Sequence, residues 1–141
     1  MPNAISKIVN RVCRGISWRY HASNLNKVTN IKEFEEYVKR VRPNFLTEHE
    51  KYSASARLEF KTVIEKLKLE LSGKSILDIG PGHGFVLEIC HELEARQIDF
   101  IDYDPFFFTW NKLKSYVRGY PIDFLQGFGP MSGNKYDVIW L

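Results

Sequence analysis

One ten-residue stretch, residues 75–84, constrains the fold of this chain more than any other. It reads Ser-Ile-Leu-Asp-Ile-Gly-Pro-Gly-His-Gly. Its first half is rich in apolar and β-branched side chains, with Ile76 and Ile79, which predicts a short buried strand. Glycines then occupy every second position, and a helical pattern begins at Phe85. In a strand, glycine loop and helix arranged in this order, the loop backbone can approach a ligand closely, because glycine has no Cβ. The N-terminus of the helix adds free N–H groups and partial positive charge.

The spacing of the glycines separates two classes of ligand. A dinucleotide fingerprint, Gly-x-Gly-x-x-Gly, requires a third glycine at position 85, where this chain has Phe85. The third glycine instead stands at Gly84, and an acid, Asp78, precedes the first glycine by two positions. This register counts against a nicotinamide-dependent oxidoreductase.

The pattern Asp78-x-Gly80-x-Gly82-x-Gly84 resembles the first motif of class I S-adenosylmethionine-dependent methyltransferases. The resemblance runs from about residue 74 to the C-terminus, roughly half of the chain. It implies that the loop packs against the methionine part of S-adenosyl-L-methionine and that the acid helps to hold the loop and the amino group of the cofactor. The cofactor-binding residues expected from this motif are Asp78, Gly80, Pro81, Gly82 and Gly84.

A second acid is the last residue of the next predicted strand, residues 98–102. A carboxylate at a strand end about twenty residues past the glycine loop can accept hydrogen bonds from both ribose hydroxyls. The segment from Phe100 to Pro105 resembles the second motif of the family, with Asp102 as the ribose acid. The resemblance places Tyr103 against adenine. Asp104, directly before Pro105, is expected to cap the next helix instead.

Two further strands are predicted, at residues 120–127 and 135–141. The family often has an acid for the adenine amino group after a glycine such as Gly127, and here the residue is Phe128, which can stack on adenine. The family's sheet has seven strands, whereas this sequence provides four. We therefore expect a fragment that continues past Leu141 in the full enzyme. The residues that orient the acceptor lie beyond the fourth strand, so no catalytic residue is named.

The alternation of strands and helices after residue 74 predicts an α/β fold: a Rossmann-like, doubly wound parallel sheet, truncated after the fourth strand. A helical N-terminal segment, residues 1–73, precedes this core, residues 74–141. Residues 1–74 carry 15 basic and 8 acidic side chains, and residues 75–141 carry 5 and 9, so the net charges are +7 and −4.

The N-terminal segment is expected to form helices. Asn30 can cap a helix at residues 31–41, with Glu33 completing a capping box, and Pro43 ends it. Thr47 is expected to cap another helical start, and Ser53 or Ser55 is expected to cap a longer helix that ends at residues 72–73. An aromatic stripe at residues 106–117 is expected to pack against the sheet as core.

Residues 1–32 contain no acidic side chain, and the apolar positions from Ile5 to Ile16 share one helical face. Such a segment suits a helix docked on the domain, a targeting peptide, an anionic membrane surface or a nucleic acid. These alternatives stay open. No run of apolar residues is long enough for a transmembrane helix.

The two cysteines, Cys13 and Cys90, lie far apart and form no CxxC pattern, so neither a disulfide framework nor a metal site is expected. Cys90 falls on the apolar face of the helix after the glycine loop and is expected to be core. A reducing compartment follows, with the cytoplasm as the default and an organelle as the alternative if the basic N-terminus is a transit peptide.

The favoured function is an S-adenosylmethionine-dependent methyltransferase, or its cofactor-binding part, which transfers a methyl group to an unidentified acceptor. A small-molecule acceptor is favoured, and nucleic acid is the weaker choice. The alternative is a non-catalytic relic of the fold that serves as an interaction module. The oligomeric state stays open.

Overall fold

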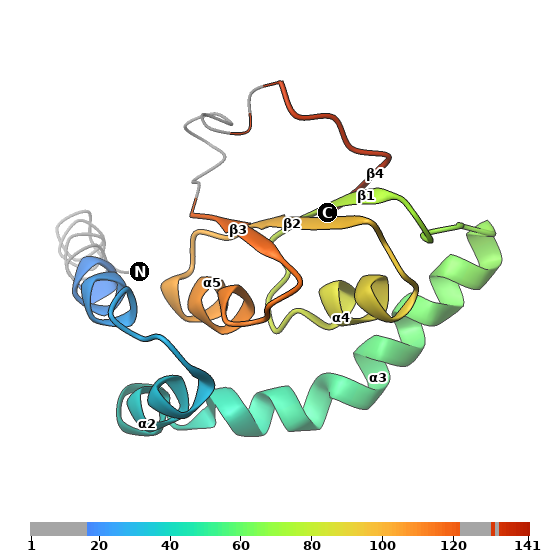
Figure 1. Cartoon of the computed structure of the whole chain (residues 1–141). Helices are drawn as coiled ribbons and strands as arrows, with labels where there is room; N and C mark the ends of the chain where they lie inside the picture. Colours follow the sequence, from blue (N-terminus) through green and yellow to red (C-terminus); the bar gives the residue numbers. More distant parts are fainter. Residues whose placement is uncertain (1–16, 122–130, 132) are drawn as a thin grey trace, which may run out of the picture.

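The computed structural model describes residues 17–121, 131 and 133–141. In this part of the chain four strands form one parallel sheet in the order β3-β2-β1-β4 (Figure 1). The strands are β1 Ser75–Ile79, β2 Gln97–Ile101, β3 Arg118–Tyr120 and β4 Val138–Trp140. The predicted α/β, Rossmann-like parallel fold is confirmed.

The central strand β1 is where the order of the sheet changes direction. Successive strands β2 and β3 extend the sheet on one side of β1, and β4 pairs with its other side. In open α/β sheets, ligands bind beyond the carboxyl ends of the strands at this kind of switch point. The Asp137 carboxylate fixes the start of β1 against β4, because it accepts hydrogen bonds of 2.8 Å from both the amide and the hydroxyl of Ser75. The switch point lies at the end of β1, where the glycine loop begins.

Helices α4 (Phe85–Glu92) and α5 (Pro105–Lys112) lie on the same face of the sheet (Figure 1). Their apolar side chains meet those of β1 and β2 in the largest core cluster, to which α3 (Asn44–Leu67) adds Phe60 and Ile64. Cys90 is 1% exposed in this cluster, as predicted. On the other face, Met131 covers Leu77 of β1 and Ile101 of β2.

The long helix α3 runs past α4 as far as the edge strand β4. Arg57 of α3 forms ion pairs with Glu92 of α4 and, at 3.0 Å, with Glu88. The Phe60 ring packs edge-on against Trp140 of β4, with their centroids 4.4 Å apart. Helix α3 therefore links the helical layer to the outer strand of the sheet.

Of the two contacts predicted for the capping box of α2 (Ile31–Val41), one forms as expected and the other is shifted. Asn30 Oδ1 accepts a hydrogen bond of 3.0 Å from the Glu33 amide, which confirms the predicted cap. The Glu33 carboxylate reaches back one residue further than expected and accepts from the Thr29 amide at 2.9 Å. Both contacts still satisfy backbone N–H groups that would otherwise lack a partner at the start of the helix.

The predicted start of the longer helix is wrong. Helix α3 begins at Asn44, directly after Pro43, and continues without a break through Ser53 and Ser55. The hydroxyl of Thr47 donates to the Asn44 carbonyl and that of Ser55 donates to the Tyr52 carbonyl, so these side chains bond within the helix. Hydroxyl residues bond either to a helix start or to a preceding turn, and the sequence does not distinguish the two.

The predicted end of this helix is also wrong. The helix ends at Leu67, and Lys68 takes the left-handed conformation that closes it, with φ of +51°. Gly73 lies in the turn before β1, where its amide donates to the Glu94 carbonyl at 3.0 Å. The left-handed residue at a helix end is usually glycine, so a lysine in this role gave no signal in the sequence.

Both outer strands differ from their predicted bounds. Strand β3 starts at Arg118 and ends at Tyr120, where the predicted strand began; residues 122–127 of that prediction lie outside the described residues. The two residues before Tyr120 lack apolar side chains, but Arg118 pairs with Asp99 of β2 across the sheet and also binds its carboxylate at 2.9 Å. Strand β4 covers only the last part of predicted residues 135–141.

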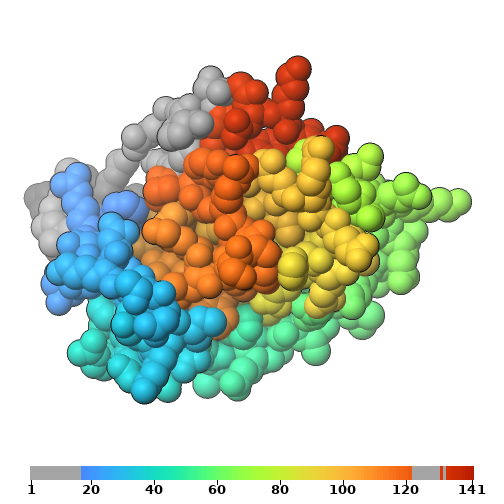
Figure 2. Space-filling model, in the orientation of Figure 1, coloured from blue at the N-terminus to red at the C-terminus, as the bar shows by residue number. Residues whose placement is uncertain are grey.

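Residues 17–25 are helical and pack against α2 and α5, and Figure 2 shows them in blue beside the orange α5. Leu25 is 2% exposed in a second core cluster with Phe34, Val38, Phe45 and Phe106. Phe106 of the aromatic stripe therefore packs against helices, which corrects the expectation of a sheet contact, whereas Phe108 packs against the sheet cluster. The apolar face from Ile5 to Ile16 lies outside the described residues. In the ranges that the structure describes, none of the helices combines the length and the apolarity that a membrane crossing requires.

Candidate functional site

The glycine loop joins β1 to α4 with three residues in the left-handed region. The φ angles of Gly80, Gly82 and Gly84 are +76°, +55° and +80°. A Cβ added at Gly80 or Gly82 would meet no atom of the described residues within 4 Å. A Cβ at Gly84 would lie 1.9 Å from Oδ1 of Asn111. The first two glycines therefore face open space, which a ligand can use, and the third is required by the close approach of α5.

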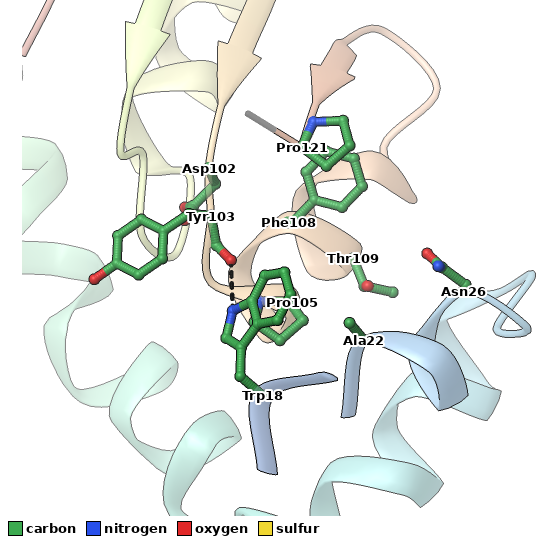
Figure 3. A pocket seen from close by; sticks show the side chains of 9 residues that line it. All are labelled: Trp18, Ala22, Asn26, Asp102, Tyr103, Pro105, Phe108, Thr109 and Pro121. Atoms are coloured by element: carbon green, nitrogen blue, oxygen red, sulfur yellow. Dashed lines mark hydrogen bonds between the residues drawn. The ribbon is translucent and has the colours of Figure 1, made fainter. Parts of the chain in front are cut away.

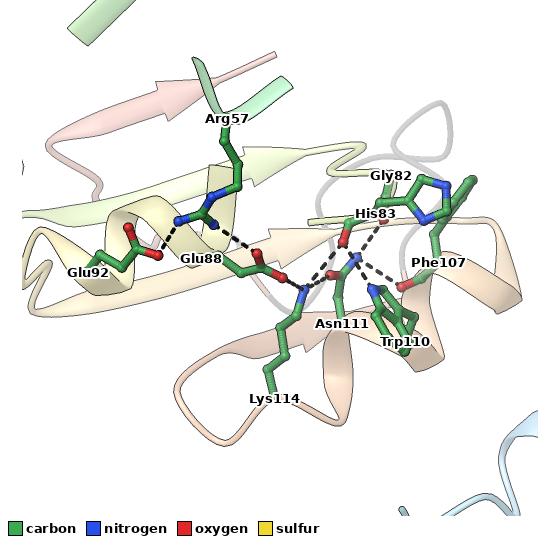
Figure 4. A network of polar contacts seen from close by, with 9 residues as sticks. All are labelled: Arg57, Gly82, His83, Glu88, Glu92, Phe107, Trp110, Asn111 and Lys114. Atoms are coloured by element: carbon green, nitrogen blue, oxygen red, sulfur yellow. Dashed lines mark hydrogen bonds and ion pairs between the residues drawn. The ribbon is translucent and has the colours of Figure 1, made fainter. Parts of the chain in front are cut away.

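Side chains from α5 and from Lys114, just after it, hold the carbonyl groups of this loop (Figure 4). The Asn111 amide donates to the Gly82 carbonyl at 2.8 Å, and the Trp110 indole donates to the His83 carbonyl at 3.0 Å. The Lys114 ammonium donates to Asn111 Oδ1 at 2.8 Å and reaches the His83 carbonyl at 3.4 Å. These hydrogen bonds hold the Gly82 and His83 carbonyls, so they fix the shape of the loop on the side that faces α5.

A chain of charges extends this network to the other helices. The side chain of Lys114 is 10% exposed and pairs with Glu88 of α4 at 3.2 Å, while Glu88 also binds Arg57 of α3 (Figure 4). Burial lowers the pKa of Lys114, and the negative charge of Glu88 opposes this shift. The glycine loop is thus tied through α5 and α4 to α3.

Asp78 is a buried carboxylate that lacks a full set of partners. Its side chain is 2% exposed, and Oδ2 has no hydrogen-bond partner among the described residues. Burial, together with the charge of the nearby Asp102 carboxylate, raises the pKa of Asp78 to about 7. A buried polar group without a partner is costly, so this oxygen is the feature that most clearly indicates a missing ligand.

Asp102 follows β2 at the same edge of the sheet. It is 5% exposed, and its Oδ1 accepts a hydrogen bond of 2.9 Å from the Asp104 amide. Burial raises its pKa to about 6, the Asp104 carboxylate adds to this rise, and the amides of Asp104, Tyr103 and Gly82 oppose it. Asp78 and Asp102 therefore belong to adjacent strand ends, since Asp78 pairs with Phe100 in the β1–β2 ladder.

A cavity of about 330 Å³ opens beside Asp102 (Figure 3). Its walls come from the N-terminal helical region, from α5 and from the ends of β2 and β3, and the nine lining residues are Trp18, Ala22, Asn26, Asp102, Tyr103, Pro105, Phe108, Thr109 and Pro121. The indole of Trp18 donates a hydrogen bond of 2.8 Å to the Tyr103 carbonyl. This volume is within the range of small-molecule sites, roughly 300 to 1,000 Å³.

Tyr103 contributes to this cavity through its backbone more than through its ring. Its side chain is 63% exposed, and in Figure 3 the ring extends away from Phe108 and Thr109. The sequence-based role of Tyr103 against adenine stays a prediction. Phe128, the other residue expected near adenine, lies outside the described residues.

His83, between the second and third glycines, packs the loop onto the helical layer. Its ring lies 4.8 Å from that of Phe45, 5.0 Å from that of Phe107 and 5.3 Å from that of His49, measured between centroids. Burial lowers the pKa of His83 to about 4, and the positive charges of His49, Arg42 and Lys114 act in the same direction. The ring is therefore neutral at pH 7 and serves as an aromatic packing group.

The structure brings most of the predicted site residues together. Asp78 and Asp102 lie beside the glycine loop, with Pro81 inside it, and the whole group lies at the carboxyl ends of β1 and β2. Sequence reasoning missed Trp18, Asn111 and Lys114. The signal for Asn111 was a polar residue at a core position of an aromatic helix, since it is 0% exposed. Within the described ranges, no group of three or more His, Cys, Asp or Glu side chains is arranged to hold a metal ion.

Comparisons with known proteins add little to this geometry. No protein-family model and no curated protein matches the sequence. Among solved structures, the fold is similar to the crystal structure of protein 1320 of Thermoplasma acidophilum, with 24% sequence identity and a TM-score of 0.48. The match covers 61% of this chain and 44% of that protein, so the chain spans less than half of its length. This similarity assigns no activity to the chain.

Proposed function

We propose that this chain binds S-adenosyl-L-methionine at the carboxyl ends of β1 and β2, as the cofactor-binding part of a methyltransferase with an unidentified acceptor. One observation carries the proposal. One carboxylate oxygen of Asp78 has no partner among the described residues, and it lies next to a loop in which a Cβ added at Gly80 or Gly82 would meet no described atom. A ligand with a positive charge and hydrogen-bond donors fits both features.

The chemistry of the two acids suits this cofactor. A cation beside Asp78 supplies the favourable interaction that its carboxylate lacks, and it lowers the pKa of that group toward the ordinary range. Asp102, one strand away, is suited to the paired ribose hydroxyls, because a carboxylate only accepts hydrogen bonds. The amides that already bind Asp102 favour its ionised form.

The cofactor, when bound, supplies a methyl group activated on a sulfonium. The residues of this chain then have three tasks: to bind, to orient and to exclude water. The anchored glycine loop fixes the backbone that contacts the ligand, and Asp78 and Asp102 fix its two polar ends. A base is required only when the acceptor must lose a proton, and no residue of the chain is assigned that role.

Isothermal titration calorimetry with S-adenosylmethionine and S-adenosylhomocysteine tests the proposal. We expect the wild-type chain to bind both ligands and Asp102→Asn to bind them about 10 to 100 times more weakly, which is the loss of a hydrogen bond to a charged group. No heat at millimolar ligand, from protein shown to be folded by circular dichroism, would reject the proposal.

Asp104→Asn is the matched control. Asp104 stands two residues from Asp102 and caps α5 through the amides of Phe106 and Phe107. Asparagine caps a helix about as well as aspartate, so this variant should fold and bind like the wild type. An equal loss of affinity in Asp102→Asn and Asp104→Asn would show that Asp102 is not the residue that binds the ribose.

A second candidate function is an interaction module that keeps the fold without turnover. It is favoured by the apolar side chain that β4 exposes, since Ile139 is 57% exposed. Transfer of a labelled methyl group from the cofactor to a component of a cell extract, by this chain alone, would exclude this candidate.

A further inference from the structure

The cavity beside Asp102 is closed by a part of the chain that the proposed function does not require. Residues 17–25 form its outer wall, with Trp18 and Ala22 on the helix and Asn26 directly after it. The opposite wall is α5, with Phe108 and Thr109, which are 8% and 6% exposed (Figure 3). The inner end of the cavity is Asp102.

The surfaces of this cavity suit a flat, mainly apolar group with polar edges. Rings of Trp18, Pro105 and Phe108 provide the apolar area, and the Asn26 amide offers both a donor and an acceptor. A second hollow of about 260 Å³ also contacts Asn26, Phe108 and Thr109, so the open space continues along α5. A nucleobase has this combination of a π-face and a polar edge.

The described part of this helix, residues 17–25, is held by contacts near both of its limits, so it forms a definite wall. Near its C-terminal end, Leu25 is buried at 2% exposure, and His21 Nδ1 lies 2.9 Å from the Tyr37 hydroxyl. Near its N-terminal end, the Trp18 indole donates to the carbonyl of Tyr103, the residue after Asp102. The contact with Tyr103 joins the helix to the backbone beside the proposed ribose acid.

We propose that helix 17–25 is the cover of the nucleoside half of the site: Trp18 closes the cavity over the purine base of the cofactor, and Asn26 reads the polar edge of that base. The inference rests on the proposed function, because Asp102 anchors the sugar from which the base extends into the cavity. It assigns the basic N-terminal region a direct part in ligand binding.

Three probes test the cover by calorimetry: S-adenosylhomocysteine, adenosine and methionine. We expect Trp18→Ala to lower the affinity for S-adenosylhomocysteine and for adenosine by the same factor, about 10-fold for the loss of one aromatic stacking contact. The affinity for methionine should not change. Tyr20→Ala is the matched control, because Tyr20 is an aromatic residue of the same helix, 64% exposed, outside the cavity. Equal affinities of Trp18→Ala and Tyr20→Ala for adenosine would overturn the proposal.

Inosine, which differs from adenosine at the edge of the base, tests Asn26. We expect the wild type to prefer adenosine over inosine and Asn26→Ala to bring the two affinities within about 2-fold of each other. A preference that is unchanged in Asn26→Ala would remove Asn26 from the reading of the base.

The outcomes separate the two proposals. If the wild type binds neither S-adenosylhomocysteine nor adenosine, the proposed function itself is rejected. Normal binding by Trp18→Ala, together with lost binding by Asp102→Asn, overturns the cover and leaves the proposed function standing.

Trp18→Phe keeps the inference testable if the alanine variant does not fold. The difference in tryptophan emission between the wild type and Trp18→Phe isolates the signal of Trp18. We expect S-adenosylhomocysteine to reduce the quenching of this signal by acrylamide at least 2-fold, because the ligand covers one face of the indole. Quenching that the ligand does not change would contradict the cover.

Discussion

At the scale of single residues, the burial of Asp78 gives the protein a measurable response to pH. Its pKa of about 7 lies above the ordinary value of 3.8, so between these values the folded state holds a proton that the unfolded state releases. The free energy of unfolding therefore falls as the pH rises from about 4 to 7, and the loss is complete above pH 7.

Replacing this carboxylate by its neutral isostere should remove the response. Without cofactor, we expect Asp78→Asn to be more stable than the wild type at pH 8, by on the order of 3 kcal/mol, and the difference to vanish near pH 4. Urea denaturation of both proteins from pH 4 to 8 measures it. A difference that does not depend on pH would show that the Asp78 carboxylate is not buried in the way described.

The glycines of the loop give a second residue-scale prediction, because they are required for different reasons. Gly84→Ala should lower the free energy of unfolding by roughly 2 to 4 kcal/mol, since its Cβ meets Asn111 and the left-handed φ adds strain. Gly82→Ala adds strain alone, so about 1 kcal/mol is expected, but its methyl group fills the space left for the ligand. Denaturation and calorimetry on both variants check this contrast, and equal losses of stability would contradict it.

At the scale of elements, the end of α3 is a site for stabilisation. Lys68 closes this helix with φ of +51°, a conformation that glycine adopts without strain. We expect Lys68→Gly to raise the free energy of unfolding by about 0.5 to 1 kcal/mol. Lys66→Gly, inside the helix, is the control and should lower it by about 1 kcal/mol. Thermal unfolding of both variants should show shifts of opposite sign.

Local chemistry explains which elements the sequence predicts well. Asn30 before α2, Asp104 and Pro105 at the start of α5, and the glycine loop all act within a few residues, so their patterns are visible in the chain. Helix α3 was misread because hydroxyl residues in its interior resemble caps. The difference lies in which backbone group each hydroxyl binds, and that is fixed only when the helix exists.

The candidate site was predictable only where its residues come from one strand and the loop after it. Asp78 lies near the end of β1, the glycines follow β1 and Asp102 follows β2, and parallel strands bring such ends together. The contacts of Trp110 and Asn111 with the loop join residues 27 and 29 positions apart, and Trp18 meets Tyr103 across 85 positions. No spacing rule in the sequence announces such contacts, because they depend on how α5 and the first helix pack.

At the scale of the whole molecule, β4 is the outer strand of the sheet that the described residues form. Strand β4 pairs with β1 on one side, and Ile139 is 57% exposed. Apolar edge strands favour pairing with other chains, and a lysine on the edge opposes it. We expect Ile139→Lys to stay monodisperse in dynamic light scattering at protein concentrations at which the wild type forms larger particles.

Leu58→Lys separates an edge effect from a general gain in solubility. Leu58 is 69% exposed on α3, away from the strands, so this variant adds the same charge without changing the edge. If both variants suppress association equally, the edge of β4 is not its cause.

The hydrogen bond between Trp18 and Tyr103 also bears on how the protein matures. The donor and the acceptor are 85 positions apart in the sequence, so the contact closes a long loop, and we expect it to form late in folding. A ligand held beneath Trp18 binds only molecules in which this last step is complete. By mass action, the supply of that ligand would then set the fraction of finished protein that escapes degradation.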